Sequence, residues 1–252
     1  AYGLRTGLYT SPHLERINER IAIDGQELSD DDFVDMWDQI KDLVAIVDAK
    51  MAESGRPPMS FFEVLTSMAI WKFADAPVDV AVVEVGMGGL WDATNVLDAD
   101  AAIIGPVDMD HMQWLGDTVE QIATEKAGII KENGTVVVEQ QDKRAMQGIE
   151  QEAKKKHARI ITVEQSDIAR CSGYALRLCG TFQWENAAAA ELAARYVLGK
   201  RYGGPEYEMQ YDKTEPKSEE TDLNDRIKSA LEEAVWPGRM EIVSKEPFLL
   251  VD

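Results

Sequence analysis

Residues 82–95, VVEVGMGGLWDATN, decide the fold, because in them an apolar run ends in a carboxylate followed by glycines. Residues 79–85 are nearly continuous Val and Ala, which predicts a strand buried on both faces. Ligands of open α/β sheets bind beyond the carboxyl ends of the strands, and Glu84 stands at that point. A carboxylate in such apolar surroundings is costly unless it is paired or binds a metal. We therefore expect a ligand site here, with satisfaction of Glu84 by nearby backbone or an Arg as the alternative.

The glycines after Glu84 do not form a dinucleotide-binding fingerprint. Gly86 and Gly88 fit the first two glycine positions of that motif, but Trp91 occupies the third. The glycines still allow the backbone to approach a ligand closely. A loop that cradles some other ligand is the better interpretation.

Short apolar runs alternate with amphipathic stretches along the rest of the chain. Ser29, Ser60 and Asp117 are placed to cap helices, and Leu43, Ile46 and Val47 supply part of an apolar helical stripe. The pattern predicts an α/β fold with a mostly parallel sheet flanked by helices, in which strands 79–85 and 101–107 are neighbours. The other expected strands are 5–10, 20–24, 135–138 and 159–163, and the expected helices are 29–54, 60–74, 117–126, 142–157, 184–198 and 222–235.

Composition excludes several classes of protein. The chain of 252 residues carries 26 Lys plus Arg against 46 Asp plus Glu, a net charge of −20, which disfavours binding nucleic acid over a broad surface. The only cysteines, Cys171 and Cys179, do not make a disulfide framework, so we expect a reducing, cytoplasmic location. No apolar run is long enough for a transmembrane helix, so we expect no membrane partner. We also expect the protein to be a monomer.

The chain has one expected domain boundary. Residues 203–221 are polar and acidic and predict a mobile surface loop. The WPG sequence at 236–238 leads into a new strand-like run, so we expect domains at 1–235 and 236–252. Ala1 is not an initiator Met and Asp252 ends an apolar run, and we expect both ends to be cuts in a longer protein.

Three further stretches carry candidate site residues. An Asp-His pair at His111 follows the strand at 101–107, and could supply a metal ligand with a supporting partner. Ser11 precedes Pro12 in a loop after a short strand, which leaves its hydroxyl free to bind. Lys126 ends a helix, where a Lys ordinarily complements the helix dipole.

Together these stretches resemble the folylpolyglutamate synthase/dihydrofolate synthase family of the Mur ligase superfamily. The similar segments follow the family's order across almost the whole chain, and their combination is more specific than any one of them. They are YTSPHLERINERI (9–21), SFFEVLT (60–66), VVEVGMGG (82–89), DATNV (92–96), DH (110–111), LGDT (115–118), IATEKAGIIK (122–131) and WPGRMEI (236–242).

The resemblance implies a P-loop NTPase-like central domain joined to a smaller α/β domain, and a set of site residues. Ser11, Glu84 and His111 match positions that hold Mg²⁺. Lys126 matches a lysine that is carbamylated in the family. The ammonium form of this lysine would be repelled by a nearby Mg²⁺, and burial would favour the neutral amine, which can add CO₂ to form a carbamate. For the nucleotide, Asn186 matches an asparagine near the base, Arg239 an arginine that contacts phosphate, and Asp252 an aspartate that opens a nucleotide-contacting loop. The implied substrate pocket involves Ser11, Pro12, His13, Leu14, Phe61 and Phe62. For the two Phe residues, a plain core role is an equal alternative.

The sequence also departs from the family pattern. Leu90 stands where Arg is usual, Phe182 stands where His is usual, and residues 166–174 are short for the family. The family's phosphate loop, G-x-x-G-K-[ST], does not occur in residues 1–252 and is expected to precede Ala1. We therefore expect this chain alone not to hydrolyse ATP at a useful rate.

The implied activity is ATP-dependent amide ligation through an acyl phosphate, with ATP, Mg²⁺ (one or two ions), L-glutamate and a folate or dihydropteroate as ligands. Two alternatives remain open. One is a Mur-type ligase for a cell-wall peptide, against which the TSPHL and SFFE segments argue. The other is an inactive remnant that binds a partner.

Overall fold

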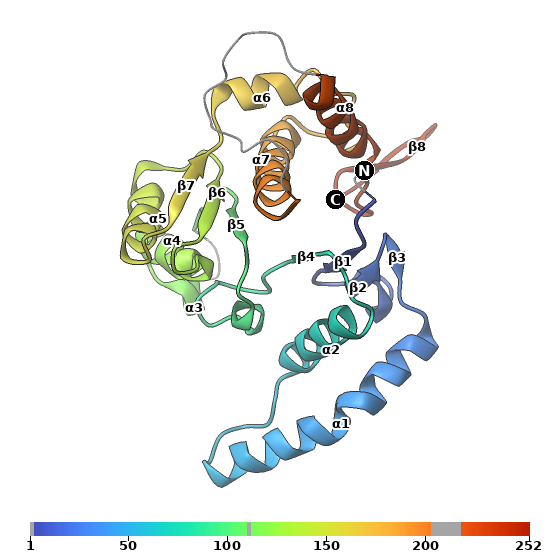
Figure 1. The fold of residues 1–252 in the computed structure, drawn as a ribbon, viewed down its shortest axis with the longest axis vertical. Coiled ribbons are helices and arrows are strands. Elements are labelled where there is room, and N and C mark those ends of the chain that lie inside the picture. The colour runs from blue at the N-terminus through green and yellow to red at the C-terminus, as the bar shows by residue number, and fades with distance from the viewer. Residues whose placement is uncertain (1–2, 110–111, 203–217) are drawn as a thin grey trace. The chain divides into compact units, whose positions relative to one another are not determined.

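The computed structural model describes residues 3–109, 112–202 and 218–252 (Figure 1). The chain divides into two compact units, Gly3–Leu97 and Asp98–Asp252. The expected boundary between residues 235 and 236 stays a prediction. Each unit is an α/β assembly whose strands include parallel pairs.

The unit Gly3–Leu97 contains a sheet of order β3-β2-β1-β4. β1 and β4 are parallel, whereas β1–β2 and β2–β3 are antiparallel. The helices α1 and α2 begin after Ser29 and Ser60, and each serine forms the predicted capping box. The bounds are β1 Thr6–Tyr9, β2 Ile21–Ile23, β3 Gln26–Glu27, β4 Val80–Val83, α1 Asp30–Glu53 and α2 Phe61–Asp75, with 3₁₀ helices η1 Ile17–Arg20 and η2 Ala93–Val96.

Two expectations for this unit are wrong. The apolar stripe of α1 is not at Leu43, Ile46 and Val47, which are 40–61% exposed. The buried face is instead formed by Met36, Ile40 and Val44, whose spacing of four residues places them on one side of the helix.

β4 is also not buried on both faces, because Val82 is 56% exposed. β4 lies at the edge of its sheet, where β1 is its neighbour among the described strands. Apolar composition therefore overstated the burial of this strand.

The unit Asp98–Asp252 contains a parallel sheet of order β5-β6-β7. The bounds of its strands are β5 Ala101–Ile104, β6 Thr135–Val138 and β7 Arg159–Thr162, followed by an antiparallel hairpin of β8 Glu241–Lys245 and β9 Phe248–Val251. The helices are α3 Met112–Leu115, α4 Val119–Lys126, α5 Lys143–Lys155, α6 Gln165–Cys171, α7 Gln183–Tyr202 and α8 Ser218–Glu233, with the 3₁₀ helix η3 Ala127–Ile129.

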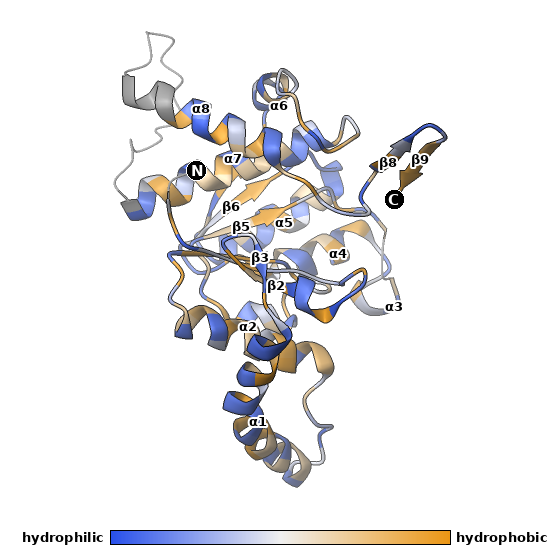
Figure 2. Cartoon of the chain, turned by 90° about the vertical axis from the view of Figure 1, so that its right-hand side faces the viewer, coloured by the Kyte–Doolittle hydropathy of each residue, from blue (hydrophilic) through white to orange (hydrophobic). Residues whose placement is uncertain are grey.

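Helices cover both faces of the β5-β6-β7 sheet (Figure 1). Val136 and Val138 pack into a core with α4 and α5, and Val137 packs into a second core with α7. The alternation follows from the two-residue period of a strand. Figure 2 shows the hydrophobic colouring of β5 and β6. Each of these fully buried Val side chains stabilises the fold by about 1.5–3 kcal/mol.

Two expectations that involve this unit need correction. Glu84 follows β4, and His111 comes after β5. In the described sheets β4 pairs with β1 and β5 pairs with β6, so β4 and β5 are not the neighbours that were expected. Both runs are apolar, and hydrophobicity alone does not specify which strands pair. Thr118, rather than Asp117, caps α4, since its side chain accepts the N–H of Gln121.

The expected loop at 203–221 lies mostly outside the described residues, and its last part belongs to α8. The short helices α3 and α6 had not been predicted.

Candidate functional site

The parallel pairing of β1 and β4 brings Ser11 and Glu84 together. Tyr9 is in register with Val83, so both chains leave the sheet at the same edge. Glu84 donates its backbone N–H to the carbonyl of Tyr9 at 2.9 Å, and the backbone N–H of Ser11 donates to Glu84 Oε2 at 2.6 Å. The Glu84 side chain is exposed. This placement brings Ser11, whose hydroxyl is a hard oxygen ligand, next to the Glu84 carboxylate at the carboxyl end of parallel strands.

Asp92 holds the glycine loop that follows Glu84. Its Oδ2 accepts the backbone N–H groups of Gly86 and Met87, each at 3.0 Å, and its Oδ1 accepts the N–H of Thr94 at 2.9 Å. A Cβ on Gly86 would lie 2.6 Å from the Phe62 ring, so only glycine fits there. A role for Asp92 was not predicted from the sequence, although an Asp two residues before a Thr is a recognisable turn and cap signal.

A single carboxylate also fixes the loop after Ser11. Glu19 accepts the backbone N–H groups of Leu14, Glu15 and Arg16 at 2.6–2.8 Å. These three donors hold the pKa of Glu19 below its usual value. The predicted residue His13 accepts a hydrogen bond at Nδ1 from Arg20 Nε at 2.9 Å. Pro12 and Leu14 are exposed between these fixed points.

The two predicted aromatic residues lie in different environments. Phe61 is 59% exposed, and the Arg20 guanidinium lies 5.6 Å from its ring centroid. Phe62 packs against the core and against Tyr9, with ring centroids 5.9 Å apart. Phe61 is therefore available to a ligand, and Phe62 fits the alternative of a core aromatic.

The second unit holds the other predicted site residues. Asp108 follows β5 and is exposed. The predicted metal ligand His111 lies outside the described residues. Lys126 ends α4 and is half-buried. Among the described residues, neither Glu125 nor another carboxylate forms an ion pair with Lys126, which disfavours the surface ion pair as its role.

The three predicted nucleotide-contacting residues are all exposed. Asn186 lies in the first turn of α7, and its side-chain amide donates to Gln183 Oε1 at 3.0 Å. Arg239 lies in the turn before β8. Asp252 Oδ1 accepts the backbone N–H of Met240 at 3.1 Å, which ties the end of β9 to the start of the hairpin. The structure therefore leaves the ends of these side chains accessible to a ligand.

A further carboxylate, Glu139, was missed. It follows β6, is 4% exposed, and its Oε2 has no hydrogen-bond partner among the described residues. Burial, and secondarily the charge of Glu185, raises the pKa of Glu139 to about 7. The signal was present in the sequence, because TVVVE at 135–139 repeats the pattern of VAVVE at 80–84.

The residues present fit a magnesium ion only in part. Ser11 and Glu84 supply the oxygen ligands that Mg²⁺ prefers. Within residues 3–109, 112–202 and 218–252, no group of three or more His, Cys, Asp or Glu side chains gathers as a metal site. In the same part of the chain, no helix has both the length and the apolar character needed to cross a membrane.

Comparison with known proteins shows consistent similarity. The family model described as the Mur ligase middle domain matches residues 62–173. The chain is 31% identical over 270 residues to a dihydrofolate synthase/folylpolyglutamate synthase of Bacillus subtilis, covering 99% of this chain and 58% of the relative.

Solved structures are similar over the whole described fold. A Mycobacterium tuberculosis folylpolyglutamate synthase complexed with ADP and AMPPCP has a TM-score of 0.81 at 35% identity, covering 99% of this chain and 57% of that one. An FPGS–AMPPCP–folate complex also has a TM-score of 0.81, at 28% identity, with 99% and 61% covered. The chain therefore spans somewhat over half the length of these relatives.

Proposed function

The chain belongs to the folylpolyglutamate synthase/dihydrofolate synthase family, and from this premise we propose that the complete protein is an ATP-dependent ligase that joins L-glutamate to a folate or to dihydropteroate. The observation that carries the proposal is the contact between Ser11 and Glu84 at the carboxyl edge of β1 and β4. Relatives whose names specify this chemistry, and neighbours bound to an ATP analogue and to folate, support it.

In this proposal, Ser11, Glu84 and His111 hold Mg²⁺. The ion, when bound, neutralises charge on the transferred phosphoryl group. The chain's own contribution is to keep Glu84 oriented through the Ser11 N–H, and to fix the loop through Glu19 so that Ser11, Pro12 and His13 present a constant surface to the acceptor. Positioning of this kind accounts for much of the rate enhancement in phosphoryl transfer.

Phe61 and Phe62 complete the proposed acceptor pocket, with Phe61 as the exposed surface for a planar ring and Phe62 as its support from the core. Asn186 is proposed to lie near the base, Arg239 to contact phosphate, and Asp252 to open a nucleotide-contacting loop. The exposure of all three side chains supports this role.

Lys126 is proposed to act as a carbamate. Its half-buried position at the end of α4, and the lack of an ion pair with any described carboxylate, support a role other than that of a surface cation. The resulting anion has two oxygens that can orient the water ligands of a metal ion.

We further propose a cytoplasmic monomer with small-molecule substrates, and a central domain over residues 1–235 followed by the start of a second domain. The two free cysteines, Cys171 and Cys179, support a reducing compartment.

The test is incorporation of labelled L-glutamate by the complete protein with ATP and Mg²⁺. Dihydropteroate, a reduced folate and a UDP-linked amino-sugar peptide are supplied in turn. We expect incorporation with at least one of the first two, and none when ATP is omitted. Incorporation only into the amino-sugar peptide would reassign the protein to cell-wall synthesis, and no incorporation into any acceptor would contradict ligase activity.

A further inference from the structure

Glu139 is a buried carboxyl group with one oxygen, Oε2, that receives no hydrogen bond from the described residues. It directly follows β6 and is 4% exposed. Its backbone N–H donates to the carbonyl of Ile104 at 3.0 Å, but its Oε2 has no partner within the described residues. A buried polar atom without a partner costs free energy, so such an atom in a native structure calls for an explanation.

The carboxyl group of Glu139 lies beside the chain that leaves β5. A Cβ on Gly105 would lie 4.0 Å from Glu139 Oε1, so the carboxyl lies over the backbone just beyond β5. Gln141 fastens that backbone, because its side-chain amide donates to the carbonyl of Gly105 at 2.7 Å and its Oε1 accepts the N–H of Val107 at 2.9 Å. The Glu139 carboxyl group therefore lies at the carboxyl edge of a parallel sheet, where α/β proteins bind ligands.

The local charge selects the kind of group that Glu139 can contact. The charged side chain that acts on Glu139 is Glu185, a second carboxylate in the first turn of α7. Two carboxylates repel phosphate, whereas an N–H group without negative charge would satisfy the unpaired oxygen. Asn186, next to Glu185, adds an exposed carboxamide to the same turn.

We propose that Glu139 determines nucleotide specificity by accepting a hydrogen bond from the exocyclic amino group of adenine. This inference rests on the proposed ATP-dependent function. Of the parts of ATP, the base is the one that offers N–H donors without carrying negative charge. The same unpaired oxygen could instead serve the amino group of L-glutamate, and the experiment separates these two sources.

The experiment compares ATP with purine riboside 5′-triphosphate, which lacks the 6-amino group, as substrates of the complete protein. The quantity is the ratio of kcat/KM for the two nucleotides, measured at saturating acceptor and L-glutamate. Glu139→Met keeps the length of the side chain but removes both oxygens. Glu139→Gln keeps one oxygen that accepts a hydrogen bond. Glu132→Gln, an exposed position before β6, is the control.

We expect wild type and the control to prefer ATP, since a site built for a hydrogen bond rejects a ligand that lacks it. In Glu139→Met the ratio of kcat/KM for ATP to that for purine riboside 5′-triphosphate should fall at least about fivefold. Glu139→Gln should keep the preference. A smaller change in the kcat/KM ratio of Glu139→Met overturns the proposal. If that ratio is unchanged and the KM for L-glutamate is raised, the proposal is also overturned, and Glu139 is assigned to the amino group of L-glutamate. Failure of wild type to use ATP at all would instead contradict the proposed function, before any variant is compared.

Discussion

The backbone N–H of Ser11 donates a 2.6 Å hydrogen bond to Glu84 Oε2 across 73 residues of sequence. The bond joins the loop after β1 to the end of β4, and it uses one carboxylate oxygen while the side chain stays exposed. A carboxylate that is oriented by the backbone and accessible to solvent is suited to bind a cation.

Glu84→Gln in the complete protein tests this arrangement. Gln keeps an oxygen for the Ser11 N–H but removes the negative charge, so we expect glutamate incorporation to fall roughly 100-fold or more. The free energy of unfolding should change by less than about 0.5 kcal/mol, because the side chain is exposed. Glu27→Gln, on an exposed position of β3, is the matched control and should change neither quantity. Unaltered turnover in Glu84→Gln would make Glu84 a structural residue.

Lys126→Ala tests the proposed carbamate. Removal of the amine removes the group that adds CO₂, and we expect activity to collapse, with partial recovery when a short carboxylic acid such as acetate is added. The measurement is the initial rate across an acetate series. Lys154→Ala, on an exposed position of α5, controls for the loss of a positive charge. Full activity of Lys126→Ala without any additive would show that the carbamate role is wrong.

The sequence predicted local structure well where a chemical signal was local. Ser29 and Ser60 cap α1 and α2 as expected, because a cap depends on residues within one turn. Pairing between distant strands carried no such signal. VAVVE and TVVVE are alike as sequences, yet Val82 is 56% exposed on an edge strand and Val137 is fully buried in a central one.

The candidate site was predictable to the same degree. Ser11 and Glu84 were named from their positions after strands, and the structure brings them together. Asp92 and Glu19 were missed because their role is to bind backbone N–H groups, which depends on how the loops fold. Glu139 was missed although its pattern matched that of Glu84, since burial decides its properties and pattern alone does not reveal burial.

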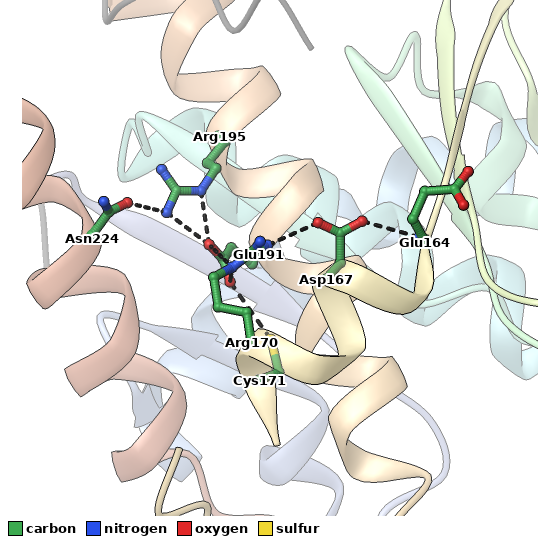
Figure 3. Close-up of polar contacts among 7 residues, drawn as sticks. All are labelled: Glu164, Asp167, Arg170, Cys171, Glu191, Arg195 and Asn224. Atoms are coloured by element: carbon green, nitrogen blue, oxygen red, sulfur yellow. Dashed lines mark hydrogen bonds and ion pairs between the residues drawn. The ribbon is translucent and has the colours of Figure 1, made fainter. Parts of the chain in front are cut away.

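A buried network of charged side chains joins α6, α7 and α8 (Figure 3). Glu191 is 1% exposed, and its Oε1 accepts two hydrogen bonds from Arg195 at 2.7 and 2.9 Å. Arg195 also donates to Asn224 on α8, and Arg170 on α6 lies 3.4 Å from Glu191. Glu191 therefore connects α7 to α6 through Arg170, and to α8 through Arg195.

Glu191→Ala should destabilise the fold by about 3–5 kcal/mol, because it removes the buried carboxylate that pairs with Arg195. Chemical denaturation measures the loss, and Glu150→Ala on an exposed position of α5 is the control. Cys171 gives a second readout. Burial, followed by the charge of Glu191, raises the pKa of its thiol to about 12, so the native thiol should resist alkylation at pH 8. A stability loss below about 1 kcal/mol would mean that the network contributes little.

Glu139 should make stability depend on pH in a predictable direction. The pKa of its carboxyl is about 7 in the folded chain against 4.5 for the ordinary group. Between pH 4.5 and pH 7 the unfolded chain has released the proton and the native chain still holds it. The contribution of Glu139 to the free energy of unfolding is therefore fully present below pH 4.5 and falls as the pH rises to 7. The loss is at most about 3 kcal/mol. Glu139→Gln has no proton to release, so its free energy of unfolding in urea, relative to that of wild type, should rise from pH 5 to pH 8. Glu132→Gln, whose position is exposed, should show no such trend. A stability difference between Glu139→Gln and wild type that stays constant over this range would contradict a protonated, buried Glu139.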